Sequence, residues 1–240
     1  MIKLQRTKDR VNSNGGQVLV GALLDRIAFG HSADAIRVGN RTRRDIANSD
    51  CLKTSVGLFV EGRIAFEEVE QYRGDDLFRE ALSLRTVASA PTLRQRFVEA
   101  KGALDPVITE DNRRLLADCV VSGLNTASGT FVPVDLDVSC MDNSRSRKEG
   151  VGRTYRGYDG FAPMFAYIGT EGYMLLNELR PGTQHCQNGT PDFLRQCLDT
   201  AEAVIGKPLL VRMDSGNDSV ENLRILHDRA AYVIKRNLRS

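Results

Sequence analysis

Two short apolar strands, each leading to an aspartate, constrain this chain more than any other feature of its sequence. The first lies within Val132–Ser139 and carries Asp137 near its end, and the second, Leu209–Met213, is followed directly by Asp214. Strands this apolar usually bury both faces, where a carboxylate is costly unless it is paired or bound to a metal. Two such carboxylates, distant in sequence, predict one shared cation.

The composition is that of an ordinary globular protein, with 41% hydrophobic and 27% charged residues among 240. A net charge of +2 is too small to imply a nucleic-acid partner by itself. The five cysteines are odd in number and show no CxxC spacing, so we expect reduced thiols and not a zinc site. No apolar leader opens the chain and no run reaches membrane-spanning length, so we expect a soluble cytoplasmic protein without a membrane partner.

Residues 1–124 are predicted to form a helical region, because apolar residues recur there at helical spacing. The predicted helices cover 18–29, 45–60, 64–72, 75–84, 91–100 and 110–124. The pair 75–84 and 91–100 is compatible with a helix-turn-helix in which Arg94 and Arg96 face DNA. An ordinary helical hairpin with solvated arginines is the alternative.

Residues 130–240 change to a strand-rich pattern. The predicted strands are 131–140, 161–168, 173–179, 209–213 and 231–235, with helices over 191–205 and 218–228. Short connections pair the first three strands antiparallel, while helical crossovers make the later strands parallel to the first. This order predicts an α/β fold with a ribonuclease H-like mixed sheet. Its first and fourth strands would be neighbours, so that Asp137 and Asp214 meet at one edge.

The acidic residues around these strands differ in their expected roles. Asp135 shares a strand face with Asp137, but Asp137 lies nearer the strand end and is the favoured metal ligand. Asp135 is then a supporting group or a satisfied surface charge. The alternative is that Asp135 is itself the metal ligand. Asp218 and Glu221 read as a capping box at a helix start. Two metal ions about 4 Å apart, bridged by carboxylates, can cleave or transfer a phosphodiester.

A basic segment, residues 143–159, follows the first of these strands. Its candidate DNA-contacting residues are Arg145, Arg147, Lys148, Arg153 and Tyr155. Cationic groups beside an acidic site can hold DNA phosphates, and tyrosines can pack on sugars or bases. A flexible, solvated loop is the alternative.

Several motifs in this half resemble the insertion-sequence transposases of the DDE superfamily. They are Val134-Asp135-Leu136-Asp137-Val138-Ser139-Cys140-Met141-Asp142-Asn143-Ser144, Lys148-Glu149-Gly150-Val151, Tyr155-Arg156-Gly157-Tyr158-Asp159-Gly160, Gly169-Thr170-Glu171-Gly172-Tyr173, Leu179-Arg180-Pro181-Gly182-Thr183-Gln184-His185 and Val211-Arg212-Met213-Asp214-Ser215-Gly216. The resemblance covers nearly all of 132–239 and extends more weakly into the first half.

The resemblance implies a bacterial, nucleoid-associated DNA transposase that cuts and pastes an insertion sequence. Asp137 and Asp214 would be its catalytic, metal-binding residues, with Mg²⁺ or Mn²⁺ as cofactor. The helical region would bind terminal inverted repeats, the core would also act on target DNA, and a homodimer would form in synapsis.

One part of the family pattern has no counterpart. The family's third acid is a glutamate on a helix after the fifth strand, and this sequence ends at Ser240, just after that strand. We therefore expect a core that is incomplete at its C-terminus, a truncated transposase. A catalytically inactive DNA-binding fragment that inhibits the intact enzyme is the alternative.

A second resemblance concerns Asp135-Leu136-Asp137-Val138-Ser139, which is similar to the aspartyl nucleophile motif of haloacid-dehalogenase-like phosphatases. That fold continues with alternating strands and helices, whereas two further strands are expected here. The phosphatase is therefore a remote alternative.

Overall fold

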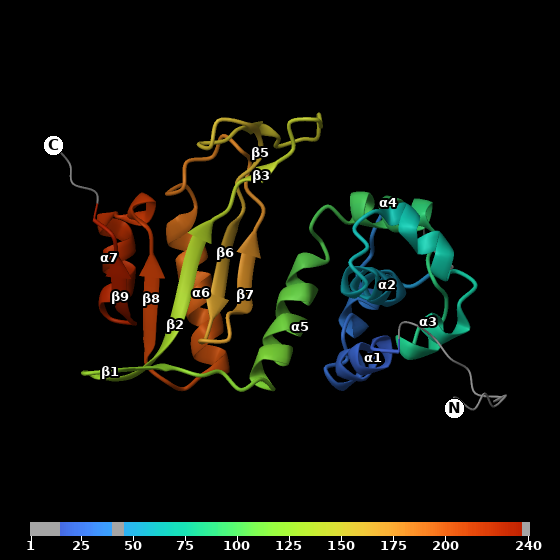
Figure 1. Ribbon diagram of the computed structural model, residues 1–240, viewed down its shortest axis with the longest axis horizontal. Coiled ribbons are helices and arrows are strands. Elements are labelled where there is room, and N and C mark those ends of the chain that lie inside the picture. Colours follow the sequence, from blue (N-terminus) through green and yellow to red (C-terminus); the bar gives the residue numbers. More distant parts are fainter. Residues whose placement is uncertain (1–14, 40–45, 237–240) are drawn as a thin grey trace, which may run out of the picture. The chain divides into compact units, whose positions relative to one another are not determined.

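The helical first half and the strand-rich second half form separate units in the computed structural model, which describes residues 15–39 and 46–236. One unit comprises Met1–Asp111 and the other Asn112–Ser240 (Figure 1). The division falls inside helix α5 (Asp105–Ala117), earlier than the predicted division between 124 and 130.

The first unit is helical, as predicted. Its helices are α1 (Gln17–Arg26), α2 (Asn48–Val60), α3 (Asp76–Ala81) and α4 (Ala90–Ala100), with 3-10 helices over His31–Ala35 and Phe66–Tyr72. Helix α3 begins where the Asp75 side chain accepts hydrogen bonds from two backbone amides, and α4 begins where Ser89 accepts one from Thr92. Residue 45, where one predicted helix began, lies outside the described residues.

The predicted helix-turn-helix has an unequal pair of helices. Helix α3 has six residues in place of the predicted ten, because the chain leaves helical geometry at Leu82 and Ser83 adopts a positive φ of 52°. Tyr72 and Phe78 stack with ring centroids 4.5 Å apart in the core of this unit. Helix α3 packs mainly against α1, and α4 packs mainly against the 3-10 helix Phe66–Tyr72, so the two helices of the predicted motif have other main partners.

The second unit contains a large mixed sheet and a small one. The large sheet is built from β1 (Leu124–Thr126), β2 (Gly129–Val138), β6 (Met164–Ile168), β7 (Tyr173–Glu178), β8 (Leu209–Met213) and β9 (Ala231–Ile234). The small sheet contains β3 (Met141–Asp142), β4 (Gly152–Arg153) and β5 (Asp159–Phe161). Helices α6 (Thr190–Val204) and α7 (Val220–His227) complete the unit.

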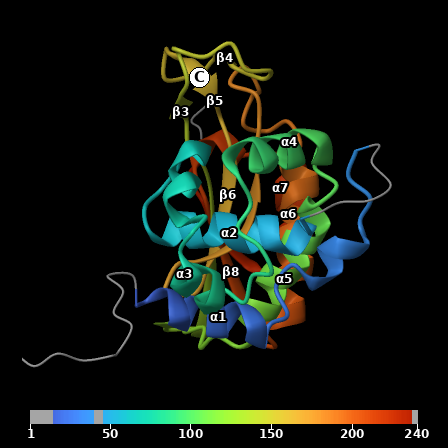
Figure 2. The same ribbon diagram turned by 90° about the vertical axis from the view of Figure 1, so that its right-hand side faces the viewer.

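The large sheet has the predicted mixed pairing. Its main order is β7-β6-β2-β8-β9, with β2–β6 and β6–β7 antiparallel and with β2–β8 and β8–β9 parallel. The parallel pairs are those joined through α6 and α7, because a strand needs a crossover to return in the same direction. The small sheet lies beyond one end of the large sheet (Figure 2).

Only one face of the large sheet is fully buried, which corrects the expectation that both would be. Leu136 and Val211 pack with Leu194 and Leu198 of α6 in one apolar cluster. Figure 1 shows α6 behind the sheet. On the opposite face Asp137 is exposed, so its carboxylate does not need a partner to be tolerated there.

Three local predictions were wrong. Helix 110–124 ends at Ala117, and Leu124 instead pairs with β2. Strand 161–168 is split, because Pro163 has no amide hydrogen to donate to a sheet. Ser219, not Asp218, caps α7 by accepting a hydrogen bond from the Asn222 amide at 3.2 Å.

No helix in the described part of the chain is long and apolar enough to cross a bilayer.

Replacing Gly21 by alanine should destabilise the helical unit. A Cβ at this position would lie 1.6 Å from the carbonyl oxygen of Ala81, so α1 and α3 would have to separate. We expect the free energy of unfolding in urea to fall by about 3 kcal/mol, the upper end for overpacking.

Gly16→Ala is the matched control, because nothing lies within 4 Å of a Cβ at that position and its φ is −60°. Its free energy of unfolding should stay the same or rise slightly. Equal losses in the two variants would contradict the close packing of α1 against α3.

Candidate active site at the end of the parallel strands

The pairing of β2 with β8 brings the two sequence-predicted aspartates to one edge of the sheet. Leu136 pairs with Met213 in the parallel register, so Asp137 and Asp214 are the next residues on their two strands. Both are exposed beyond the last paired position. The strand order thus confirms that these two carboxylates are neighbours.

Local hydrogen bonds hold each carboxylate by one oxygen. Asp214 Oδ1 accepts from the Gly216 amide at 3.1 Å and from Asn217 Nδ2 at 2.8 Å. Asp137 Oδ1 accepts from the Val138 amide at 2.8 Å. The bonds that fix these side chains therefore leave the Oδ2 atoms for a ligand.

The Asp214 loop is tied to α7 through a buried side chain. Asn217 is 1% exposed, and its carbonyl oxygen accepts a hydrogen bond from Asn222 Nδ2 at 2.9 Å. The short Ser-Gly-Asn 3-10 turn after β8 is thus set by packing below it. This fixes the direction of the Asp214 carboxylate.

The pKa of Asp137 is raised above its usual range. The largest cause is desolvation, because the carboxylate lies among neighbouring groups although the residue as a whole is exposed. The charge of Asp214 raises the pKa further, while the Val138 amide and the charge of Arg156 act in the opposite direction. Two carboxylates that repel each other in this way are favourably placed to share a cation.

Asp135 has a different role from Asp137. Its carboxylate forms a two-pronged ion pair with the Arg212 guanidinium, its direct partner in the β2–β8 register. This pair raises the pKa of Arg212. Asp135 is therefore a surface charge satisfied across the two strands, and this engagement also speaks against a role as phosphatase nucleophile.

The segment that begins at Arg180, which sequence reasoning placed in a family motif but not in the site, lies against the Asp214 loop. The Cys186 thiol donates to the Gly216 carbonyl oxygen at 3.1 Å, and burial together with the charge of Asp214 raises the pKa of this thiol. The Leu179-Arg180-Pro181-Gly182 motif was the available signal, because Arg180 anchors this segment.

Arg180 is a buried cation at the centre of this segment, only 1% exposed. Its guanidinium forms an ion pair with Glu178 at 2.6 Å and donates to the Cys186 carbonyl oxygen at 3.2 Å. It also donates to Thr190 Oγ1 at 3.0 Å and lies over the Phe193 ring. The segment that contacts Gly216 is therefore held from within the unit.

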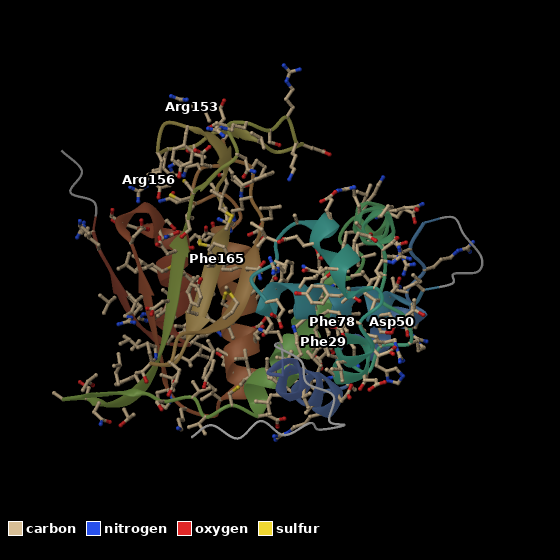
Figure 3. The ribbon with its side chains drawn as sticks, turned by 45° about the vertical axis from the view of Figure 1, so that its right-hand side comes forward. Phe29, Asp50, Phe78, Arg153, Arg156 and Phe165 are labelled. Carbon is tan, nitrogen blue, oxygen red and sulfur yellow. The ribbon has the colours of Figure 1, made fainter. Side chains whose placement is uncertain are left out.

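The basic residues predicted to contact DNA gather at the same end of this unit. Figure 3 shows Arg153 and Arg156 there, with Phe165 on the sheet below. All the predicted residues of this segment are exposed: Arg145, Arg147, Lys148, Arg153 and Tyr155. The small sheet orders part of the segment, so it is more than the flexible loop of the alternative.

The two arginines predicted on α4 are both engaged within the helical unit. Arg96 is 7% exposed and donates to Asn48 Oδ1 and to the Ile46 carbonyl oxygen, so its expected position facing DNA is corrected. Helical spacing turns it inward, where it satisfies polar groups at the start of α2 and just before it. Arg94 is exposed, pairs with Glu67 and lies over the Phe66 ring.

Within residues 15–39 and 46–236, no group of three or more histidine, cysteine, aspartate or glutamate side chains has the arrangement of a metal site. The candidate site therefore offers two carboxylates, Asp137 and Asp214.

Comparison with known proteins links the chain to one family. Residues 1–237 match the family model described as transposase DDE domain group 1. No curated protein matches the sequence. A similar solved structure is the cryo-EM structure of the piggyBac transposase synaptic complex with hairpin DNA, at 14% sequence identity and a TM-score of 0.45. The match covers 93% of this chain and 51% of that one, so this chain spans about half the length of that protein.

Replacing Asp214 by asparagine should lower the pKa of Asp137. The neutral amide removes one cause of the raised pKa, while its oxygen can still accept from Gly216 and Asn217. NMR titration of the Asp137 carboxyl carbon in metal-free buffer measures the change.

The same variant should alter the pH dependence of stability. Because the folded pKa of Asp137 lies above its unfolded value, the free energy of unfolding falls as pH rises through that pKa. Asp214→Asn should lessen this fall. An unchanged Asp137 pKa would show that the two carboxylates do not interact.

Proposed function

Since this chain belongs to the transposase DDE domain group 1 family, we propose that it supplies the DNA-cleaving core of an insertion-sequence transposase. The observation that carries the proposal is the placement of Asp137 and Asp214 on adjacent parallel strand ends. A ribonuclease H-like reading of the β7-β6-β2-β8-β9 sheet is consistent with this role.

The two carboxylates fit a divalent cation. Mg²⁺ prefers oxygen ligands and is commonly held by one or two carboxylates together with substrate phosphates. Asp137 and Asp214 supply such a pair, and the hydrogen bonds that orient them use Oδ1 on each. Mg²⁺ or Mn²⁺, when bound, supplies Lewis-acid stabilisation of charge at a phosphodiester. The chain's own contribution is to fix the two carboxylates and to hold the DNA backbone beside them.

DNA is the proposed partner, and the basic segment beyond β2 is its proposed contact surface. Residues 143–160 contain five lysines and arginines against two acidic residues. Such a surface binds phosphates without regard to sequence. The helical unit is proposed to recognise element-end repeats, and a synaptic homodimer would bring two ends and a target together.

A second candidate is a DNA-binding protein that does not cleave. The described residues offer two acids where the resemblance implies three, and two carboxylates hold a cation less tightly. Such a protein would inhibit an intact transposase by occupying its DNA ends.

Asp137→Asn should abolish metal-dependent cleavage of element-end DNA. Loss of a group that only supports a metal ligand lowers activity by up to about 100-fold, so loss of a direct ligand should reduce cleavage by at least that factor. Gel analysis of end-labelled duplex in Mg²⁺ or Mn²⁺ measures this, together with calorimetric titration of Mn²⁺ into the DNA-free protein.

Asp135→Asn is the matched control, because it removes a carboxylate from the same strand face whose partner is Arg212. It should leave cleavage and Mn²⁺ affinity unchanged. Salt-sensitive DNA binding without cleavage by the wild-type chain would favour the second candidate. No affinity for any duplex would refute both.

A further inference from the structure

A tight turn in the basic segment is built to hold one arginine in place. Both the amide and the hydroxyl of Thr154 donate to the Tyr158 carbonyl oxygen, at 2.9 and 2.8 Å. The Gly157 amide donates back to the Thr154 carbonyl oxygen at 3.0 Å, with Gly157 at a φ of 88° that favours glycine. Thr154 is only 4% exposed. The residue at the tip of this turn is Arg156.

The turn is fastened to the end of β2, close to Asp137. The Tyr158 hydroxyl donates to the Cys140 carbonyl oxygen at 3.1 Å. Gly160 lies so close to the Met141 carbonyl oxygen that a Cβ there would be 1.9 Å from it. The short distance along the chain from Asp137 to Cys140 therefore fixes the turn beside the two-carboxylate site.

A second contact fastens the same region to the Arg180 segment. A Cβ at Gly182 would lie 2.2 Å from the carbonyl oxygens of both Gly152 and Gly160. Arg180, two residues earlier, is the buried cation described above. The base of the basic segment is thus packed from two sides.

Arg156 differs from its neighbour Arg153. Arg153 has a carboxylate partner, Asp159, at 3.8 Å. In the part of the chain that the structure describes, Arg156 forms no ion pair, but its guanidinium lies over the Tyr155 ring, 5.3 Å from the ring centroid.

This arrangement presents an exposed guanidinium on a turn that is tied to the chain just after Asp137. Arginine presents a planar set of donors that match a phosphate, and stacking on an aromatic ring limits its freedom before binding. The exposed guanidinium lies on the turn that Tyr158 ties to Cys140, three residues after Asp137. A DNA phosphate could then contact a cation held by the carboxylates on one side and the guanidinium of Arg156 on the other.

We propose that Arg156, stacked on Tyr155, binds the DNA phosphate next to the bond that is cleaved at the Asp137–Asp214 site. The proposal rests on the proposed function and adds a substrate-binding residue to it. Arg156 would fix the position of the DNA backbone relative to the two carboxylates.

The test measures binding of the full chain to a fluorescein-labelled DNA duplex at several salt concentrations. Arg156→Ala should weaken binding about tenfold at low salt. The slope of log affinity against log salt should fall by about 0.9, the value for one phosphate. Arg156→Lys, which keeps the charge, should retain the wild-type slope while binding more weakly.

Arg195→Ala is the matched control, because it removes one exposed arginine that pairs with Asp192 and Glu221 on α6 and α7. Its salt slope should equal that of the wild type. Thermal unfolding of each variant checks that the fold is kept. A variant that unfolds would also lose affinity, but Arg156→Lys would then not keep the wild-type salt slope.

A methylphosphonate scan of the duplex then locates the contact. Neutralising one phosphate at a time should weaken wild-type binding at several positions, and Arg156→Ala should be insensitive at one of them. That position should adjoin the cleaved bond. This proposal alone would be overturned if Arg156→Ala lost its sensitivity at a phosphate far from the cleaved bond. It would also be overturned if Arg156→Ala bound every modified duplex as the wild type does. Absence of salt-dependent binding by the wild-type chain would overturn it together with the proposed function.

Discussion

The parallel pairing of β2 with β8 is the constraint on which the candidate site depends. It joins two strands more than 70 residues apart, as the pairing of Asp135 with Arg212 shows, and α6 makes the crossover that allows them to run in one direction. Because Leu136 pairs with Met213, Asp137 and Asp214 follow at the same level. A one-residue slip would turn one carboxylate to the buried face, where α6 packs.

Electrostatics then separates the acids of this region into different roles. Asp135 is neutralised by Arg212 within the sheet, whereas Asp137 and Asp214 repel each other and remain open to solvent. The unit holds this unfavourable pair because the Asp214 loop is fixed by Asn217 below it and by Cys186 beside it. A pair of carboxylates that repel each other in a rigid setting is suited to binding a cation, which is the role proposed for this pair.

Buried arginines show how the two units use charge for structure. Arg180 stabilises the segment that contacts the Asp214 loop, and Arg96 ties α4 to α2 in the helical unit. Each has several acceptors, so its burial is offset by hydrogen bonds. The exposed arginines of residues 143–160 have few such partners, which leaves them available to phosphates. An arginine is therefore available to a ligand only where its guanidinium group has few acceptors within its own unit.

The sequence by itself determined the strand order, the neighbouring positions of Asp137 and Asp214, and the helical character of the first half. These follow from periodicity and connection lengths, which are local properties of a chain. Only the tertiary structure decided that Arg96 is buried, that Asp135 pairs with Arg212, and that Arg156 stacks on Tyr155 in a turn tied to Cys140. Those outcomes depend on which groups, distant in sequence, the folded backbone brings within hydrogen-bond or Coulombic range. The spacing of residues along the chain does not predict these contacts.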